Sequence, residues 1–175
     1  WSPDGSLIAT GSGDDTVHVW DAATGNTLVV FELHQSDVNG VAWSPDGFLI
    51  ASGNEDGTVY IWESLSGEYF AMRRHVVDML NSMAWSPDGT RIVFSGSSGG
   101  INDLYSYDVA GGEITRLTDD KYTELNPTWS PDGRRMVFTL GQNGPGEVFM
   151  ADADGLNRRE KGGSDHPAGR AIKDF

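Results

Sequence analysis

Three side chains in this sequence have the types that acyl-transfer enzymes use. His34 could act as a base, Ser52 as a nucleophile and Asp56 as the carboxylate that orients the base. However, Ser52 lies in a predicted strand (49–52), and we expect no nucleophile elbow of the Gly-x-Ser-x-Gly type in the sequence. We therefore expect no catalytic site and predict that the chain is not an enzyme.

Metal ions and phosphate groups are not predicted ligands either. Residues 152–155 resemble half of a calcium loop, but the third ligand position and the distal bidentate Glu are missing. Residues 96–100 are rich in Gly and Ser, yet no helix is predicted after them to bind phosphate. Cys is absent, and no metal-ligand spacing relates the four histidines, His18, His34, His75 and His166. We expect no metal site and no cofactor.

The composition limits the possible partners. The chain has 175 residues, with 12 Lys and Arg against 26 Asp and Glu, and a formal net charge of −14. Because this charge repels phosphate groups, we predict no nucleic-acid partner. No apolar run has the length of a membrane span, so membrane insertion is not predicted. The absence of Cys leaves the compartment undetermined, and the localisation stays unknown.

The elements that must position these side chains follow from a repeated pentapeptide. Trp-Ser-Pro-Asp-Gly begins at Trp1, Trp43, Trp85 and Trp129, a period of 42 to 44 residues. In each copy Pro fixes φ at the first turn position and Gly takes the positive φ that reverses the chain. Self-similarity at this period indicates stacked repeat units.

Each period contains four predicted strands. In the second period these are an inner strand (38–43), a nearly continuous apolar run (49–52), a strand (58–62) that ends at the acid Glu63, and a more polar outer strand after the next Gly turn. Apolar runs of this kind are typical of strands covered on both faces. Four antiparallel strands in about 42 residues form the blade of a β-propeller.

We therefore predict an all-β fold, a single β-propeller segment of about four four-stranded antiparallel blades. The predicted blades cover residues 1–34, 35–76, 77–120 and 121–162, and a tail covers residues 163–175. The first blade lacks its inner strand apart from Trp1.

The first half of the chain resembles WD40 repeats. Trp20-Asp21 and Trp62-Glu63 stand where that family has its Trp-Asp dipeptide, and the run from His34 to Trp43 fits the inner-strand pattern. The resemblance implies a structural hydrogen-bond tetrad in the second blade, made by His34, Ser52, Asp56 and Trp62. In such a tetrad the buried polar groups satisfy one another and join a loop to two strands.

The second half is similar to the propeller repeats of TolB instead. This resemblance is carried by Asn126–Gly133 and Glu147–Gly155. Tyr107 and Ala151 stand where the tetrad has Trp, and His75 lies one residue out of register with His34. Repeats of this type also occur in the propeller domains of prolyl-oligopeptidase-like peptidases.

The two ends favour a fragment of a larger propeller. Residues 166–168 echo residues 126–128, so a fifth inner strand could begin there. Either residues 170–175 supply the missing inner strand of the first blade, or the chain is part of a longer one, which we favour. An open array has unpaired strand edges, so we expect the remaining blades or another copy to close the ring.

The resemblance also separates two rims. It places the Ser-Pro-Asp-Gly turns on one rim and the variable loops on the other, where ligands are expected. The candidate binding residues on the variable rim are Gln35, Asn54, Glu55, Ser97, Tyr122 and Gln142. Tyr122 is the best candidate anchor, because aromatic side chains dominate interface hot spots.

The predicted function is a non-catalytic propeller scaffold for protein–protein interaction, with a protein or peptide as partner. Two alternatives remain open: the gating propeller of a prolyl-oligopeptidase-like serine peptidase, and a TolB-like cell-envelope protein. A Gly-x-Ser-x-Gly motif beyond Phe175 would favour the first, and a signal peptide before Trp1 would favour the second.

Overall fold

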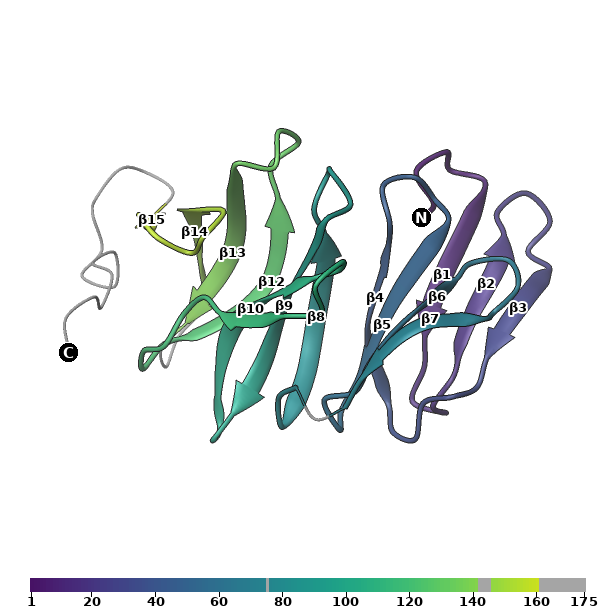
Figure 1. The fold of residues 1–175 in the computed structure, drawn as a ribbon, viewed down its shortest axis with the longest axis horizontal. Coiled ribbons are helices and arrows are strands. Elements are labelled where there is room, and N and C mark those ends of the chain that lie inside the picture. The colour runs from purple at the N-terminus through teal and green to yellow at the C-terminus, as the bar shows by residue number, and fades with distance from the viewer. Residues whose placement is uncertain (75, 142–145, 161–175) are drawn as a thin grey trace.

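A computed structural model describes residues 1–74, 76–141 and 146–160. Regular structure in these residues consists of fifteen strands. None of the described residues forms a helix that could cross a membrane. The strands make four antiparallel sheets that stand side by side, from the N-terminal sheet on the right of Figure 1 to the C-terminal sheet on the left. The predicted all-β propeller architecture is confirmed.

We number these sheets as blades 1 to 4. Blade 1 consists of β1 (Leu7–Gly11), β2 (Val17–Asp21) and β3 (Thr27–Phe31). Blade 2 consists of β4 (Val38–Trp43), β5 (Leu49–Asn54), β6 (Val59–Glu63) and β7 (Tyr69–Arg73). Blade 3 consists of β8 (Met79–Trp85), β9 (Arg91–Ser98), β10 (Ile101–Asp108) and β11 (Ile114–Arg116). Blade 4 consists of β12 (Thr123–Trp129), β13 (Arg135–Gly141), β14 (Glu147–Asp152) and β15 (Arg159–Glu160).

The inner strands define the central side of the array. β8 packs against both β4 and β12, whereas blade 1 has three strands and β1 is its free edge. Each inner strand has a β-bulge, which lies at Asn39, at Asn81 and at residues 126–127. Bulges increase the local twist of a strand, and here they recur at the same height in three blades. The predicted tail and its possible closing strand lie outside the described residues.

The repeated pentapeptide forms the same turn in every blade. In blade 2 the hydroxyl of Ser44 donates to Asp46 Oδ1 at 2.5 Å, and the amide of Phe48 donates to the same oxygen at 3.0 Å. These hydrogen bonds lower the pKa of Asp46, with the Ser44 bond as the largest cause. Gly47 has φ of 77°, which an L side chain rarely adopts. The turns lie along the upper edge of Figure 1.

Apolar residues fill the spaces between neighbouring blades. Between blades 1 and 2, Val17, Val19 and Phe31 pack against Trp62. The cluster between blades 2 and 3 is the largest of the three. The cluster that faces blade 4 is smaller, and its buried members are Leu104, Phe138, Leu140, Phe149 and Ala151.

Candidate functional site

Three members of the predicted tetrad meet inside blade 2. Ser52 lies on β5 and is fully buried. Its Oγ accepts a hydrogen bond from Trp62 Nε1 at 3.1 Å and lies 2.7 Å from His34 Nε2. Because the hydroxyl accepts the indole proton, it can donate its own proton to His34. The indole of Trp62 stacks on Phe31 of blade 1 at 4.5 Å between ring centroids, so the same group also joins two blades.

The fourth member, Asp56, acts on this group through its charge. Burial lowers the pKa of His34 to about 4, and the charge of Asp56 partly opposes that shift. Asp56 Oδ1 also accepts the amide of Thr58 at 2.9 Å. His34 is therefore neutral near pH 7, and the arrangement joins the β3–β4 loop to β5 and β6. An enclosed Ser52 hydroxyl has no access for a substrate, so the geometry does not provide a nucleophile.

A second serine has the spacing of a nucleophile elbow. Residues 96–100 read Gly-Ser-Ser-Gly-Gly, so the expectation that no Gly-x-Ser-x-Gly sequence occurs is corrected, with Ser98 in the central position. Ser98 ends β9, and the chain turns directly into β10 at Ile101. The turn is held by Asp78 Oδ2, which accepts the amide of Gly99 at 2.8 Å. The strand–turn–strand context provides neither a nucleophile elbow nor a phosphate-binding helix.

The half calcium loop is a hairpin turn in the structure. Asp152 Oδ2 accepts a hydrogen bond from Asn157 Nδ2 at 2.7 Å, and Asp154 Oδ1 accepts the amide of Leu156 at 3.0 Å. Within the described ranges, no group of three or more His, Asp or Glu side chains could hold a metal ion.

The candidate binding residues differ in exposure. Gln35 and Glu55 are exposed in loops, whereas Ser97 and Tyr122 are half-buried. Asn54 is fully buried, and its Oδ1 accepts the amide of Thr58 at 2.9 Å. The prediction that Asn54 contributes to a binding surface is therefore corrected, because its side chain holds the β5–β6 turn instead.

The aromatic anchor predicted at Tyr122 is also less available than a free loop side chain. Tyr122 packs against the apolar cluster of blades 3 and 4, and the Lys121 ammonium lies 5.5 Å from its ring centroid. Gln142 lies outside the described residues.

The loops opposite the Ser-Pro-Asp-Gly turns form a surface that we call the loop rim. Its loops are joined by backbone hydrogen bonds: Glu55 N to Asp37 O at 2.9 Å, Val76 N to Gly57 O at 3.1 Å, and Asp78 N to Ser97 O at 2.8 Å. Its exposed acidic residues are Asp14, Glu32, Asp37, Glu55, Asp78 and Asp119. Its exposed aliphatic side chains are Leu33, Met79 and Ile101. The loop rim thus presents separate apolar side chains among carboxylates and two exposed cations, Arg74 and Lys121, on a backbone joined by hydrogen bonds.

Sequence reasoning missed a buried ionic cluster between blades 3 and 4. Arg158 Nη1 lies 3.0 Å from Glu124 Oε1 and 2.7 Å from Asp120 Oδ2. Beside it, Arg116 Nη2 lies 2.6 Å from Asp103 Oδ2. Asp103 and Glu124 are fully buried. Thr118 Oγ1 lies between them, 3.2 Å from Glu124 Oε2 and 3.4 Å from Asp103 Oδ1.

Two carboxyl groups of this cluster have pKa values above their ordinary range. Burial, together with the nearby charge of Asp120, raises the pKa of Glu124 to about 8, while Arg158 opposes the shift. Burial also raises the pKa of Asp103, against the effect of Arg116. The one signal in the sequence is that Asp103 and Glu124 are charged residues at positions that fall within strands, β10 and β12. Arg158, the partner of Glu124, lies 34 positions further along the chain, so the sequence pattern does not indicate that pair.

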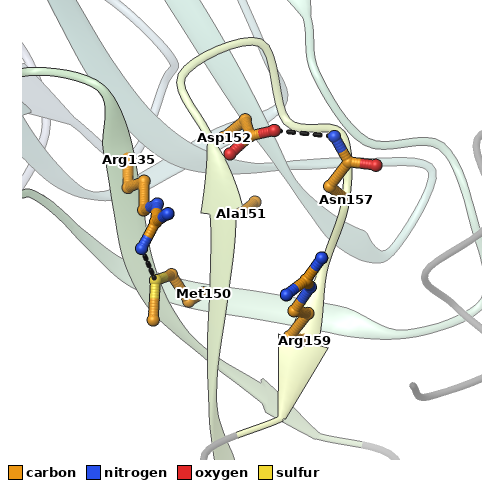
Figure 2. Close-up of a pocket in the computed structure, with 6 residues that line it drawn as sticks. All are labelled: Arg135, Met150, Ala151, Asp152, Asn157 and Arg159. Carbon is orange, nitrogen blue, oxygen red and sulfur yellow. Dashed lines mark hydrogen bonds between the residues drawn. The ribbon is translucent and has the colours of Figure 1, made fainter. Parts of the chain in front are cut away.

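Blade 4 has a cavity of about 250 Å³ on the face that no other described blade covers. Figure 2 shows Arg135 and Arg159 on either side of Met150, with Asp152 and Asn157 above them. Arg135 Nη1 lies 3.7 Å from the sulfur of Met150. Among the described residues, neither guanidinium has a carboxylate within salt-bridge distance. No sequence prediction concerned this face.

Comparison with protein families agrees with the division of the chain into two kinds of repeat. Residues 54–166 match the family described as TolB beta propeller domain. Residues 1–21 and 25–63 match WD domain, G-beta repeat.

Two curated proteins are similar to short parts of the chain. A probable serine/threonine-protein kinase PkwA of Thermomonospora curvata is 56% identical over 34 residues, which are 19% of this chain and 5% of that protein. The U5 small nuclear ribonucleoprotein 40 kDa protein of Mus musculus is 48% identical over 42 residues, which are 24% of this chain and 12% of that protein. The matches therefore span a small part of either relative.

A solved structure shows the same fold. The crystal structure of the β-propeller domain of Cps50 (Swd1) from Myceliophteria thermophila superposes with a TM-score of 0.72 at 15% sequence identity. The superposition covers 87% of this chain and 50% of that propeller domain.

Proposed function

The chain belongs to the TolB β-propeller family, and from that premise we propose that it is a non-catalytic scaffold that binds other proteins through the loop rim. The observation that carries the proposal is the combination of exposed Leu33, Met79 and Ile101 with loops whose backbones are hydrogen-bonded to one another. A fixed backbone reduces the entropy lost on binding, and single apolar side chains can enter pockets of a partner.

The charge of the loop rim indicates the chemistry of the partner. Exposed carboxylates such as Glu55 and Asp37 lie on the same rim as the apolar side chains, and the whole chain carries a net charge of −14. A protein segment with Lys or Arg beside apolar residues would match this surface in both charge and polarity. Nucleic acid would be repelled by the same charge.

A charge-reversal experiment tests the proposal. Partners are first captured from cells that express the protein, and one purified partner is then titrated against variants. We expect Asp37→Lys/Glu55→Lys to weaken binding about tenfold or more, because both carboxylates face the partner. Glu68→Lys/Glu113→Lys introduces the same charges on the opposite rim and should leave the affinity unchanged. Equal loss of affinity in both double variants would contradict binding through the loop rim.

The family match supports a second candidate, a TolB-like cell-envelope protein. The match over residues 54–166 includes the half of the chain that departs from the WD40 pattern. Fractionation of source cells tests this candidate, because an envelope protein would be recovered with the envelope or periplasmic fraction. Recovery with the cytosol would exclude it and leave the scaffold proposal intact.

A further inference from the structure

We propose that blade 2 carries a second protein-binding surface on the rim opposite the loop rim, and that this surface takes a partner segment whose apolar face is bordered by Lys or Arg. The surface consists of Phe48, Leu65, Tyr69 and Phe70, which we call the turn patch. The turn patch shares no residue with the loop rim, so either surface can fail its test alone. With both surfaces, one chain can hold two partners at once.

The turn patch gathers the most exposed apolar side chains in one place. Apart from Trp1, its members are the four most exposed large apolar residues of the described chain: Phe48 is 68% exposed, Leu65 65%, Tyr69 58% and Phe70 69%. Together they leave on the order of 400 Å² of surface in water, which is the size of the largest patch on a typical monomeric protein. Patches of this size mark interaction sites, whereas single scattered apolar side chains do not.

Two neighbouring turns hold these side chains together. The amide of Ser64 donates to the carbonyl oxygen of Phe48 at 2.9 Å, so the β6–β7 turn, which carries Leu65, lies against the β4–β5 turn. The β6–β7 turn leads directly into β7, whose first two residues are Tyr69 and Phe70. Because the backbone is held by hydrogen bonds, little entropy is lost when a partner binds to it.

The other blades show that the fold does not require apolar side chains at these positions. Phe48 stands five residues after the first Trp of its repeat, Leu65 two residues after the acid that ends β6, and Phe70 three residues after the next Gly. With the exception of Leu28, the equivalent residues are small or polar: Ser6, Thr90 and Arg134 for Phe48; Ala23, Ala110 and Asp154 for Leu65; Leu28 and Thr115 for Phe70.

Phe48 also lacks a hydrogen bond that its equivalents make. In blade 1, Ser6 Oγ donates to Asp4 Oδ2 at 2.8 Å, and in blade 3, Thr90 Oγ1 donates to Asp88 Oδ1 at 2.8 Å. The ring of Phe48 cannot make such a bond and stays in water, so it does not stabilise the turn. Aromatic side chains are enriched in protein interfaces, and binding a partner gives this ring a role that folding does not.

The charges beside the turn patch indicate the chemistry of the partner. Glu63 and Glu68 are exposed on the same hairpin. The sequence has no Lys or Arg before Arg73, whose guanidinium lies 5.7 Å from the ring centroid of Tyr107 in blade 3. A partner segment with Lys or Arg around an apolar face therefore matches the turn patch in both charge and polarity.

A second copy and a membrane match the turn patch less well. Contact between two turn patches would bring Glu63 and Glu68 of both copies together, and like charges across an interface oppose association. The same carboxylates would be repelled by the negative surface of an anionic membrane.

Titration with two synthetic amphipathic peptides tests the proposal. The first peptide has Leu on one helical face and Lys on the other, and the second has Glu in place of every Lys. Every titration uses the chain with Asp37→Lys/Glu55→Lys, so that binding at the loop rim does not contribute. We expect this chain to bind the Leu/Lys peptide at least about tenfold more tightly than the Leu/Glu peptide.

A patch variant removes the apolar side chains without a change of charge. Phe48→Ser/Leu65→Ala/Phe70→Thr introduces residues that other blades have at these positions, so it should fold normally, and urea denaturation checks this. Tyr69 is kept because its ring packs edge-on against Tyr60 at 6.2 Å. The patch variant should bind the Leu/Lys peptide at least about tenfold more weakly.

Two control variants separate the turn patch from general effects of polarity and charge. Leu28→Thr/Val30→Thr/Val148→Thr removes three exposed apolar side chains from other blades and should bind the Leu/Lys peptide with unchanged affinity. Glu63→Lys/Glu68→Lys should reverse the preference between the two peptides. Glu113→Lys/Glu147→Lys changes the net charge by the same amount on blades 3 and 4 and should leave the preference as it was.

Four outcomes would overturn the proposal. Two of them are equal affinity for the two peptides, and unchanged affinity of the patch variant for the Leu/Lys peptide. The third is dimerisation in sedimentation velocity that the patch variant loses, which would assign the turn patch to a second copy. The fourth is binding to phosphatidylcholine vesicles that the patch variant loses, which would assign it to a membrane.

Discussion

At the scale of single residues, Ser52 shows why a Ser-His-Asp set need not be catalytic. Its one hydroxyl accepts from Trp62 and faces His34, and both contacts are enclosed in the core of blade 2. A nucleophile needs a free path to a carbonyl carbon and a base that can take its proton. Here the hydroxyl instead removes the cost of burying an indole N–H and an imidazole together.

Loss of Trp62 should therefore lower the free energy of unfolding more than loss of a buried aromatic residue outside the tetrad. We expect Trp62→Ala to lower the free energy of unfolding by about 3–5 kcal/mol, because it removes buried area and the hydrogen bond to Ser52. Tyr107→Ala should lower it less, although Tyr107 is also buried. Urea denaturation measures both variants. Equal shifts of the midpoint would argue against a stabilising role of the hydrogen-bonded group.

The protonation of His34 should appear in the pH dependence of stability. Its pKa is about 4 in the folded chain and about 6.5 in an unfolded chain. The unfolded state therefore binds a proton first as the pH falls, so the contribution of neutral His34 is complete above about pH 6.5 and is lost toward pH 4. This loss is about 3 kcal/mol.

The measurement is urea denaturation of the unaltered chain and of His34→Gln between pH 4 and 7.5. The difference between the two free energies of unfolding should shrink as the pH falls, and other titrating groups cancel in that difference. Parallel curves would show that His34 is not held neutral by burial.

At the scale of elements, the loops between blades depend on one glycine more than on the others. Gly57 has φ of 73°, and a Cβ there would lie 1.9 Å from the carbonyl oxygen of Val77. Gly5 has φ of 74° and nothing within 4 Å of the same position. The two sites share the backbone conformation and differ in the space around it.

Substituting Ala at each of the two positions separates the cost of backbone strain from the cost of steric conflict. Gly5→Ala should cost about 1–2 kcal/mol, which is the cost of a left-handed L residue. Gly57→Ala should cost at least about 2 kcal/mol more, because the β7–β8 loop must move and break the hydrogen bond from Val76 N to Gly57 O. Thermal denaturation compares them, and equal losses would contradict the close approach of the two loops.

The stability contributed by Glu124, between blades 3 and 4, should change with pH in the opposite direction to that contributed by His34 in blade 2. The pKa of Glu124 is raised to about 8, so the folded state retains a proton that the unfolded state has released above about pH 4.5. The unaltered chain should thus lose stability relative to Glu124→Gln as the pH rises from about 4.5 to 8, by roughly 2–4 kcal/mol. Gln keeps an acceptor for Arg158 without the titration. Denaturation curves at matched pH values test this, and an unaltered chain that kept or gained stability relative to Glu124→Gln as the pH rises would contradict it.

The turns and strands were predictable from the sequence, whereas several contacts between distant residues were not. The Ser-Pro-Asp-Gly turns and the apolar runs predicted blades because each depends on local chemistry within a few residues. The joining of His34 to Ser52 was predicted through a family resemblance, since those residues lie 18 positions apart. Arg158 and Glu124 lie 34 positions apart, and no family resemblance indicated that they are in contact. Burial of Asn54 was missed because a polar residue beside a turn normally faces solvent.

At the scale of the whole molecule, the chain is an array in which each blade contacts only its neighbours. The stability of such an array is approximately a sum of terms from each repeat and from each interface. Blades 2 and 3 have two neighbours, while blades 1 and 4 have one among the described residues. The burial of strands follows this order, since five of the six residues of β5 and five of the eight of β9 are buried, whereas β1 contains no buried residue.

Amide hydrogen exchange should therefore show a gradient along the array. We expect the amides of β5 and β9 to exchange only through the opening with the highest free energy. The amides of β1 and β14 should exchange through openings whose free energy is about 2–4 kcal/mol lower. The measurement is mass spectrometry or NMR at a concentration at which the chain is monomeric. Equal protection in all four blades would contradict the array description, because it would mean that the chain opens as one cooperative unit.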